Sequence, residues 1–272
     1  MKIPDIQLND KSTIPQIGLG LWQVKDNAQF VTGFEGAIKA GYRHFDSAQI
    51  YQNEAMLGEG WQASGVKRDE LFLTTKIWID NFGRKQAPKS FEESLGKLQT
   101  DYVDLLLIHF PVTILRKKAW LALEEIQAAG GAKSIGVSNY TIRHLEEMKK
   151  YAKVMPAVNQ VELHVFLQQP ELVKYCREHD IVIEAYSPLA HAKAMDNTAI
   201  AGIADKHGKT YAQIMLRWCV EQGFVVLPKS VTPSRIKENI DIFDFQLDDE
   251  DMQAIATQDQ NLRTAWSPVH VP

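Results

Sequence analysis

The sequence has few cysteines and no long apolar run. Only Cys176 and Cys219 occur among its 272 residues, and neither belongs to the close-spaced pattern of a metal or redox site. We expect two buried thiols rather than a disulfide. The longest apolar runs, such as LLLI at 105–108, cannot span a bilayer, and the segment MKIPDIQLND lacks the apolar core of a signal peptide. We therefore expect a cytoplasmic protein with no membrane partner.

The sequence also lacks a large excess of acidic or basic residues. The chain carries 30 basic and 34 acidic residues, for a net charge of −4, and no long block of one sign. Neither nucleic acid nor an anionic membrane is expected as a partner. A composition of 45% apolar and 24% charged residues is that of an ordinary globular protein. We expect a monomer that binds a small molecule.

No linker rich in proline, glycine or serine divides the chain. Its length suits an α/β barrel, which commonly forms one domain of about 250 residues, so we predict a single domain over residues 1–272. Eight β-rich or apolar runs alternate with segments of helical periodicity. These runs cover residues 16–22, 42–47, 71–78, 104–110, 133–139, 156–162, 181–187 and 224–230.

Repeated strand–helix–strand units imply parallel strands with right-handed crossovers, and eight such strands can close a barrel. We predict an α/β fold of the (β/α)8 TIM-barrel type. The segment IQLNDKSTIPQI predicts an N-terminal β-hairpin that turns at Asn9 and Asp10 and covers the barrel floor. An open doubly wound sheet is the alternative, but it would carry a GxGxxG loop. The glycines of IGLGLW are followed instead by Trp22 and Gln23.

Two helices have clear end signals. Apolar residues over 30–38 share one face before Gly41. Thr210 with Gln213 forms a capping box at the start of a helix that ends at Gly223.

Polar side chains stand at the ends of three neighbouring strands. Asp46 ends the second strand, Lys76 nearly ends the third and His109 nearly ends the fourth, while Tyr51 follows Asp46 in the stretch DSAQIYQNE. The carboxyl ends of barrel strands meet at one mouth. Taken singly, the lysine and the aspartate could be solvated and the histidine could be a core residue. Together they favour a site, because a buried lysine or aspartate requires a partner.

These four side chains predict acid catalysis. Asp46 and Lys76 can pair across adjacent strands. A tyrosine beside a buried ammonium has its pKa lowered from about 10, which makes it a better proton donor. We interpret Tyr51 as the general acid, Lys76 as the group that tunes it, Asp46 as the anchor of Lys76, and His109 as the donor that orients a substrate carbonyl.

The stretch KSVTPSRIKEN predicts an anion site. Thr232 is placed to cap a helix and Pro233 to begin it, so free backbone N–H groups and the positive helix end face outward beside Lys229 and Arg235. Read alone, this stretch could equally be an ordinary capped helix with surface charges.

Several motifs occur together in one order: GYRHFDSAQIYQNE, TTKIW, LLLIHFP, IGVSNY, NQVELH, AYSPL and LPKSVTPSRIKENIDIFDF. Over residues 14–262 the sequence resembles the aldo-keto reductase family. The resemblance implies a barrel that binds NADPH across its mouth and reduces aldehydes or ketones by hydride transfer. It also puts Asp46, Tyr51, Lys76 and His109 on the catalytic tetrad of the family.

The same resemblance implies the contacts of the cofactor. The nicotinamide is expected to contact Ser138, Asn139, Gln160 and, by ring stacking, Tyr186. The pyrophosphate path is expected along Ser187 and Leu189. The 2′-phosphate and ribose are expected at Lys229, Ser230, Thr232 and Arg235, and the adenine at Glu238 and Asn239. Val231 is expected as a further cofactor contact.

The substrate pocket is expected to be shallow. The residues expected to contact the substrate are Trp22, Ile50, Trp78, His109 and Phe110. The loop VTILRKK and the ten residues after Leu262 are short, and Phe110 stands where many family members carry tryptophan. By DSAQIYQNE and TTKIW, the sequence is most similar to the prokaryotic 2,5-diketo-D-gluconate reductase-like members, which act on methylglyoxal and diketo sugar acids.

Two other functions are open to a barrel of this kind. One is a non-catalytic NADPH-binding sensor, but a sensor has no need of the acid Tyr51. The other is a metal-dependent hydrolase using Asp46, His109 and Glu162. Such enzymes usually gather several histidines at strand ends, so we expect no metal.

Overall fold

The strands form a parallel barrel. The computed structural model describes residues 3–193 and 196–272, and its main sheet has eight strands in the order β10-β9-β8-β7-β6-β5-β4-β3. The strands of this sheet are β3 Leu19–Gly20, β4 His44–Asp46, β5 Phe72–Ile77, β6 Val103–Ile108, β7 Ala132–Ser138, β8 Val158–Glu162, β9 Val182–Tyr186 and β10 Val225–Leu227.

The first and last strands close the barrel. Ile17 forms a parallel bridge with Val226, and the N–H of Gly18 donates to the carbonyl of Val226 at 2.9 Å. The predicted barrel of eight strands is therefore confirmed. The first strand is shorter than predicted in its pairing with β4, because residues 16–18 pair with β10 instead.

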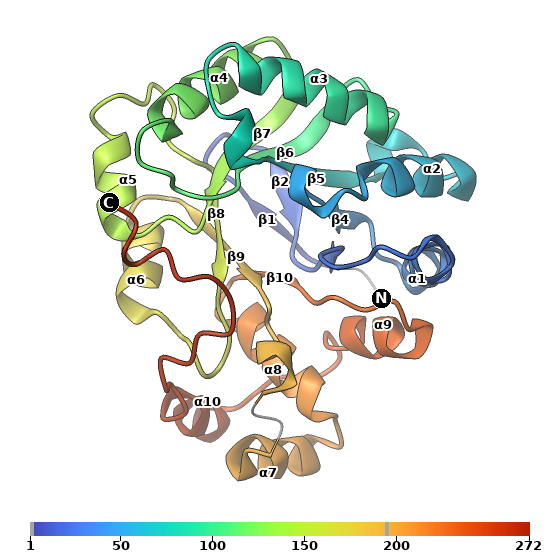
Figure 1. Cartoon of the computed structure of the whole chain (residues 1–272). Coiled ribbons are helices and arrows are strands. Elements are labelled where there is room, and N and C mark those ends of the chain that lie inside the picture. The colour runs from blue at the N-terminus through green and yellow to red at the C-terminus, as the bar shows by residue number, and fades with distance from the viewer. Residues whose placement is uncertain (1–2, 194–195) are drawn as a thin grey trace.

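Helices surround the barrel (Figure 1). The α-helices are α1 Asn27–Ala40, α2 Glu54–Ser64, α3 Gln86–Leu98, α4 Arg116–Ala128, α5 Ile142–Met148, α6 Pro170–Glu178, α7 Thr198–His207, α8 Tyr211–Glu221, α9 Pro233–Ile240 and α10 Asp249–Ala256. Short 3-10 helices are η1 Gln49–Tyr51, η2 Arg68–Glu70, η3 Ile79–Asn81 and η4 Ala190–Ala192.

The end signals of two helices are confirmed. Helix α1 buries Phe30 and Phe34 against the strands, and Gly41 ends it in the left-handed region at φ 103°. Helix α8 begins with the predicted capping box, in which the backbone N–H of Gln213 donates to the hydroxyl of Thr210.

The predicted N-terminal hairpin covers the floor of the barrel. Strands β1 Asp5–Gln7 and β2 Thr13–Pro15 pair antiparallel. Leu8 and Ile14 are buried in one cluster with side chains from β5, β6, β8 and β10. This hairpin closes the end of the barrel that lies opposite the strand ends carrying the polar groups.

A close approach between helix α1 and the segment before α9 depends on glycine. A Cβ atom at Gly33 would lie only 3.0 Å from the Cα of Val231, which is tighter than ordinary packing. Glycine thus lets α1 support the segment that was predicted to bind a phosphate.

Both cysteines are buried free thiols, as predicted. Burial raises the pKa of Cys176 to about 12 and also raises the pKa of Cys219, so neither is a ready nucleophile. Within residues 3–193 and 196–272, no helix combines the length and the apolar character required to cross a bilayer.

Candidate active site

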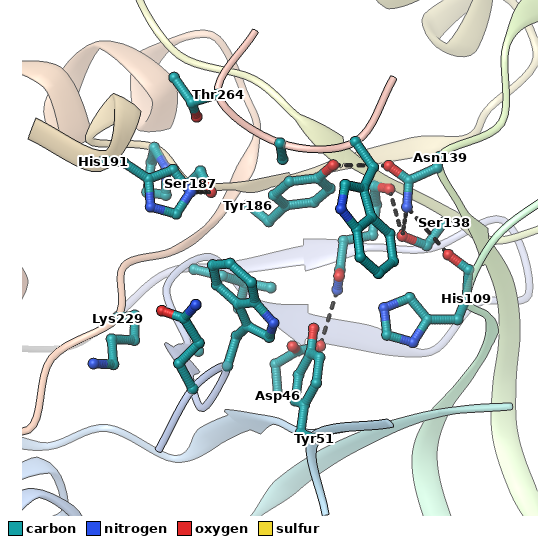
Figure 2. A pocket seen from close by; sticks show the side chains of 18 of the residues that line it. Asp46, Tyr51, His109, Ser138, Asn139, Tyr186, Ser187, His191, Lys229 and Thr264 are labelled. Carbon is teal, nitrogen blue, oxygen red and sulfur yellow. Dashed lines mark hydrogen bonds between the residues drawn. The ribbon is translucent and has the colours of Figure 1, made fainter. Parts of the chain in front are cut away.

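A cavity of about 520 Å³ opens at the carboxyl ends of the barrel strands. In Figure 2, Tyr51 and Asp46 lie between His109 on one side and His191 and Lys229 on the other. The predicted residues that line the cavity are Trp22, Asp46, Ile50, Tyr51, His109, Phe110, Ser138, Asn139, Gln160, Tyr186, Ser187, Leu189 and Lys229.

A buried ion pair lies beneath this cavity. The Nζ atom of Lys76 donates to Oδ1 of Asp46 at 2.6 Å and to the carbonyl of Ser47 at 2.9 Å. The side chain of Lys76 is completely buried and that of Asp46 is 4% exposed. Adjacent parallel strands bring the two together, since Asp46 ends β4 and Lys76 lies on β5. The predicted pairing of Asp46 with Lys76 is present.

The hydroxyl of Tyr51 lies close to this pair. Lys76 Nζ is 3.4 Å from the Tyr51 oxygen, a distance at which a hydrogen bond is weak, and it lies 4.9 Å from the centre of the ring. The prediction of a lowered pKa for Tyr51 is wrong. Burial, and then the nearby Asp46 carboxylate, hold the pKa of Tyr51 well above 10. Tyr51 therefore keeps its proton firmly.

His109 faces Tyr51 across the cavity. The two rings meet edge to face with centroids 5.5 Å apart, and Trp78 contacts His109 in the same way at 5.2 Å. Burial, and then the charge of Lys76, hold the pKa of His109 well below 6.5. The imidazole is neutral, so it can donate one hydrogen bond without carrying a charge.

A chain of hydrogen bonds orders the side of the cavity next to His109. Asn139 donates to the carbonyl of His109 at 3.1 Å and accepts from the Tyr186 hydroxyl at 2.8 Å. Ser138 donates to the carbonyl of Gln160 at 2.9 Å. Asn139 adopts the left-handed backbone conformation, with φ 65°, which asparagine tolerates better than most residues. The predicted nicotinamide contacts thus lie together on one wall.

Glu184 is a buried acid that the sequence analysis missed. It lies on β9 and is completely buried. Its Oε2 atom accepts from Nε2 of Gln160 at 2.6 Å, and the same nitrogen donates to Oδ2 of Asp46 at 2.9 Å. Burial and the nearby Asp46 carboxylate raise the pKa of Glu184 to about 8. The one sign of this acid in the sequence is that Glu184 lies two residues before Tyr186 and therefore on the same face of the strand.

The predicted anion site lies beyond the Lys229 side of the cavity. Thr232 caps α9 and Pro233 begins it, as predicted, but the Thr232 side chain makes no capping hydrogen bond. The N–H of Thr232 donates to the hydroxyl of Ser230 at 3.1 Å. Lys229 and Arg235 are exposed, and neither forms an ion pair with any described residue.

The residues predicted to contact adenine lie further along α9. The carboxylate of Glu238 accepts from the hydroxyl of Thr210 at 2.7 Å, and Asn239 is buried. Both belong to the same helix as Arg235, so a ligand bound along this helix could reach them.

The C-terminal segment forms a wall of the cavity that the sequence analysis did not expect. Thr264, Ala265 and Trp266 line the cavity. The ring of Trp266 lies 6.1 Å from that of Trp78 and 6.4 Å from that of Phe110. Trp78, which was also predicted to contact the substrate, is not one of the described residues that line this cavity. The expectation that the short tail adds little to the pocket is therefore wrong for Trp266.

Glu162 anchors this segment. Its Oε1 atom accepts from the N–H and the hydroxyl of Thr264, both at 2.6 Å, and its Oε2 atom accepts from the N–H of Ala265 at 3.2 Å. Burial by itself would raise the pKa of Glu162, but the nearby His164 and the hydrogen bonds from Thr264 and Ala265 outweigh burial and lower the pKa to about 2. The carboxylate is therefore ionised when it holds the chain.

The last residues of the chain lie beside helix α5 (Figure 1). The carbonyl of Pro272 accepts from the hydroxyl of Thr113 at 2.9 Å and from the buried Arg116. The carbonyl of Val271 accepts from Nε2 of His144 at 3.0 Å. The C-terminal segment is therefore held at two places, with Trp266 between them.

His191 also lines the cavity without having been predicted. It shares a hydrogen bond of 2.9 Å with Ser187 and meets the ring of Trp22 edge to face at 5.6 Å. Ser187, Ala190 and His191 all have positive φ near 50°, a conformation that is strained for such residues and common at functional sites.

Within the described ranges, no group of three or more His, Cys, Asp or Glu side chains is arranged to hold a metal ion. Glu162, which a metal-dependent hydrolase would require, is already bound to the C-terminal segment. These contacts argue against the hydrolase alternative.

Comparisons with known proteins agree with this geometry. The model of the aldo/keto reductase family matches residues 16–259. The glyoxal reductase of Bacillus subtilis is 43% identical over 263 residues, which cover 97% of this chain and 95% of that protein. The chain belongs to the aldo/keto reductase family.

Other relatives of this aldo/keto reductase are similar over almost their whole length. The methylglyoxal reductase DkgA of Escherichia coli (strain K12) is 43% identical, over 97% of this chain and 96% of that protein. An aldo/keto reductase structure from Brucella melitensis is 46% identical with a TM-score of 0.92, over 95% of this chain and 100% of that one. The Bombyx mori enzyme, solved in complex with NADP, is 35% identical with a TM-score of 0.92, over 97% of this chain and 95% of that one. As an aldo/keto reductase, the protein is an oxidoreductase.

Replacing Glu162 by glutamine should loosen the C-terminal segment of this aldo/keto reductase. The amide keeps one acceptor but turns an NH2 group toward a backbone N–H, and hydrogen bonds to a charged group are worth about 1.5–3 kcal/mol. We expect the amides of Thr264 and Ala265 to exchange at least about tenfold faster, measured by hydrogen exchange with mass spectrometry. Glu171→Gln, at an exposed position of α6, is the matched control. Unchanged protection in Glu162→Gln would contradict the anchoring role.

The same contact should give the protein an acid dependence. Folding lowers the pKa of Glu162 from 4.5 to about 2, so the folded state binds fewer protons than the unfolded state between these values. The stabilisation is complete above about pH 4.5 and is lost as the pH falls toward about 2. We expect the melting temperature of the native protein to fall more steeply than that of Glu162→Gln over this acid range. Equal dependence of the two melting temperatures on pH would show that Glu162 is not ionised in the folded state.

Proposed function

We propose that this aldo/keto reductase reduces small aldehydes and ketones to alcohols with NADPH, with Tyr51 as the general acid. The observation that carries the proposal is the buried pair of Lys76 and Asp46, which holds a charged group directly beneath the Tyr51 hydroxyl at the bottom of an apolar cavity. Burying an ion pair costs free energy of desolvation, and its presence here therefore indicates a role in structure or function. Here it lies against a tyrosine that keeps its proton.

Each side chain of the site has a separate role in the proposed reaction. His109, being neutral, donates a hydrogen bond to the carbonyl oxygen of the substrate and orients it. Tyr51 donates its proton to the same oxygen as negative charge develops there. Lys76, held by Asp46, stabilises the phenolate that Tyr51 leaves behind. When bound, NADPH supplies the hydride that adds to the carbonyl carbon.

The residues present fit NADPH. Lys229 and Arg235 are cations without ion-pair partners in the described ranges, and α9 begins beside them without a side-chain cap. A phosphate group would satisfy all three. Ser138, Asn139 and Gln160 offer polar atoms to the carboxamide of a nicotinamide. The Bombyx mori relative, solved with NADP, supports the same cofactor.

The cavity favours small substrates. Its volume of about 520 Å³ must hold the nicotinamide end of the cofactor as well as the substrate. Trp22, Phe110 and Trp266 supply apolar walls, but Trp266 is 67% exposed and Trp22 is 44% exposed, so the walls are open. The names of the glyoxal and methylglyoxal reductases support dicarbonyls or diketo sugar acids as the substrate class. A single domain over residues 1–272, a monomeric state and a cytoplasmic location stay predictions.

Tyr51→Phe should remove the proton donor and leave the cofactor site intact. We expect turnover of NADPH with methylglyoxal to fall by at least about a hundredfold, measured by the loss of absorbance at the NADPH band, while NADPH still quenches the protein fluorescence. The Phe variant keeps the ring that packs against His109, so packing is conserved. Near-native turnover in this variant would contradict the role of Tyr51. Failure of the native protein to oxidise NADPH with any carbonyl would favour the sensor alternative.

Arg235→Ala should weaken NADPH binding more than NADH binding. Only NADPH carries the 2′-phosphate that a guanidinium can grip with two hydrogen bonds. Losing such a contact costs about 1.5–3 kcal/mol, or roughly ten- to hundredfold in affinity. The dissociation constants can be measured by fluorescence quenching. Lys237→Ala, two positions along the same helix, is the control, and an equal effect of both variants would contradict a specific phosphate site.

A substrate panel should rank small polar carbonyls above bulky ones. Each methylene hidden from water contributes only about 0.8 kcal/mol, and the open walls can hide few of them. We expect methylglyoxal and diketo sugar acids to exceed a ketosteroid in kcat/KM, with high Michaelis constants throughout. A ketosteroid in first place would show that the pocket closes around larger substrates.

A further inference from the structure

One amide in the barrel interior joins two carboxyl groups. The nitrogen of Gln160 donates one hydrogen to Asp46 at 2.9 Å and the other to Glu184 at 2.6 Å. Gln160 is 2% exposed and Glu184 is completely buried. An amide nitrogen has only two hydrogens to give. Both of them are therefore directed into the barrel.

This sharing fixes the orientation of the amide. With its nitrogen held by two carboxyl groups, Gln160 can present only its carbonyl oxygen to the cavity that it lines. In the opposite orientation, that oxygen would face the carboxylate oxygen of Asp46 and be repelled by it. The pocket therefore receives an acceptor at this position, which suits the NH2 group of a carboxamide.

The groups around Glu184 favour its neutral form. The titratable groups that face it are His44 and Asp46 from β4, Lys76 from β5 and Tyr51 from η1, while β10 presents apolar side chains. Burial lowers the pKa of His44 to about 3, and Tyr51 holds its proton, so both are uncharged. The Asp46 carboxylate raises the pKa of Glu184 more than the charge of Lys76 lowers it.

One oxygen of Glu184 is left for a proton. Its Oε1 atom has no hydrogen-bond partner among the described residues and lies 3.5 Å from Nε2 of His44. Nε2 of His44 also shares a hydrogen bond of 3.2 Å with the hydroxyl of Thr74. In the neutral tautomer that carries its hydrogen on Nδ1, Nε2 is an acceptor, and a proton on Oε1 would point at it. An ionised Glu184 would instead be an unbalanced charge in a closed interior.

We propose that Glu184 is a positioning residue of this active site, which keeps its proton and, together with Asp46, holds the amide of Gln160 with its oxygen facing the cofactor pocket. The positioning part rests on the proposed function, because Gln160 has a ligand to orient only if a nicotinamide enters the cavity. The protonation part stands without it. Glu184 acts through Gln160 and contacts neither substrate nor cofactor.

Three variants test the proposal. Glu184→Gln keeps an acceptor for Gln160 and cannot ionise, whereas Glu184→Leu has a similar volume and offers no acceptor. Glu54→Leu is the matched control, because Glu54 is also buried and hydrogen-bonded across elements, to Thr75 at 2.6 Å, without touching Gln160.

The first measurement is thermal unfolding between pH 5 and pH 8. A group whose folded pKa is raised binds more protons when folded than when unfolded, so its stabilisation is lost as the pH rises. We expect the melting temperature of Glu184→Gln, relative to the native protein, to rise steadily over this interval. Parallel melting curves would overturn the claim that Glu184 keeps its proton. This test uses no cofactor.

The second measurement is NADPH binding at pH 7 by fluorescence quenching. Glu184→Leu loses one hydrogen bond that holds Gln160, so we expect its affinity to fall about five- to tenfold, while Glu184→Gln recovers most of that loss. Glu54→Leu should bind as the native protein does. Equal affinity in Glu184→Leu and Glu54→Leu would overturn the positioning role. If the native protein itself binds no NADPH, the proposed function fails instead.

The third measurement keeps the proposal testable should Glu184→Leu not fold. The ionised carboxylate of Glu184 would raise the pKa of Tyr51 further and make it a weaker acid. We expect the kcat/KM of the native protein for methylglyoxal to fall above about pH 8, and that of Glu184→Gln to hold its value about one pH unit further. Superimposable pH profiles would overturn the proposal.

Discussion

The contact between Lys76 and Asp46 is the constraint on which the site depends. An ammonium without exposure to water is stable only with a close opposite charge and full hydrogen bonding, and Lys76 has both at 2.6 Å and 2.9 Å. The partners come from adjacent parallel strands, so the contact exists only when β4 and β5 are in register. Because Tyr51 follows β4 by a few residues, the same register sets its hydroxyl above the pair.

The rest of the cavity is arranged around this buried charge. One carboxylate oxygen of Asp46 accepts from Lys76 and the other accepts from Gln160. Asp46 thereby links the proton donor Tyr51 and its neighbour Lys76 to the wall that contains Ser138 and Asn139. The charge of Lys76 also helps to keep His109 neutral. A substitution of Lys76 or Asp46 would therefore affect both the proton donor Tyr51 and the wall that contains Asn139.

The C-terminal segment is held at the site by a buried carboxylate as well as by packing. Glu162 accepts hydrogen bonds from Thr264 and Ala265, and this brings Trp266 over the pocket although most of its surface is exposed. The size limit of the pocket thus depends on a few polar contacts at its edge.

The eight strands, the floor hairpin and the start of α9 could be predicted from the sequence, because periodicity, turn residues and capping are local properties of the chain. The meeting of Asp46, Lys76 and His109 could be predicted too, because all strand ends of a parallel barrel share one mouth. The positions of Glu184 and Trp266 at the site and the raised pKa of Tyr51 follow from the folded arrangement instead. The contacts that produce them join residues 114 positions apart, as from Gln160 to Asp46, or 102 apart, as from Thr264 to Glu162. No local pattern encodes such pairs, and burial, which sets the pKa values, exists only once the chain has folded.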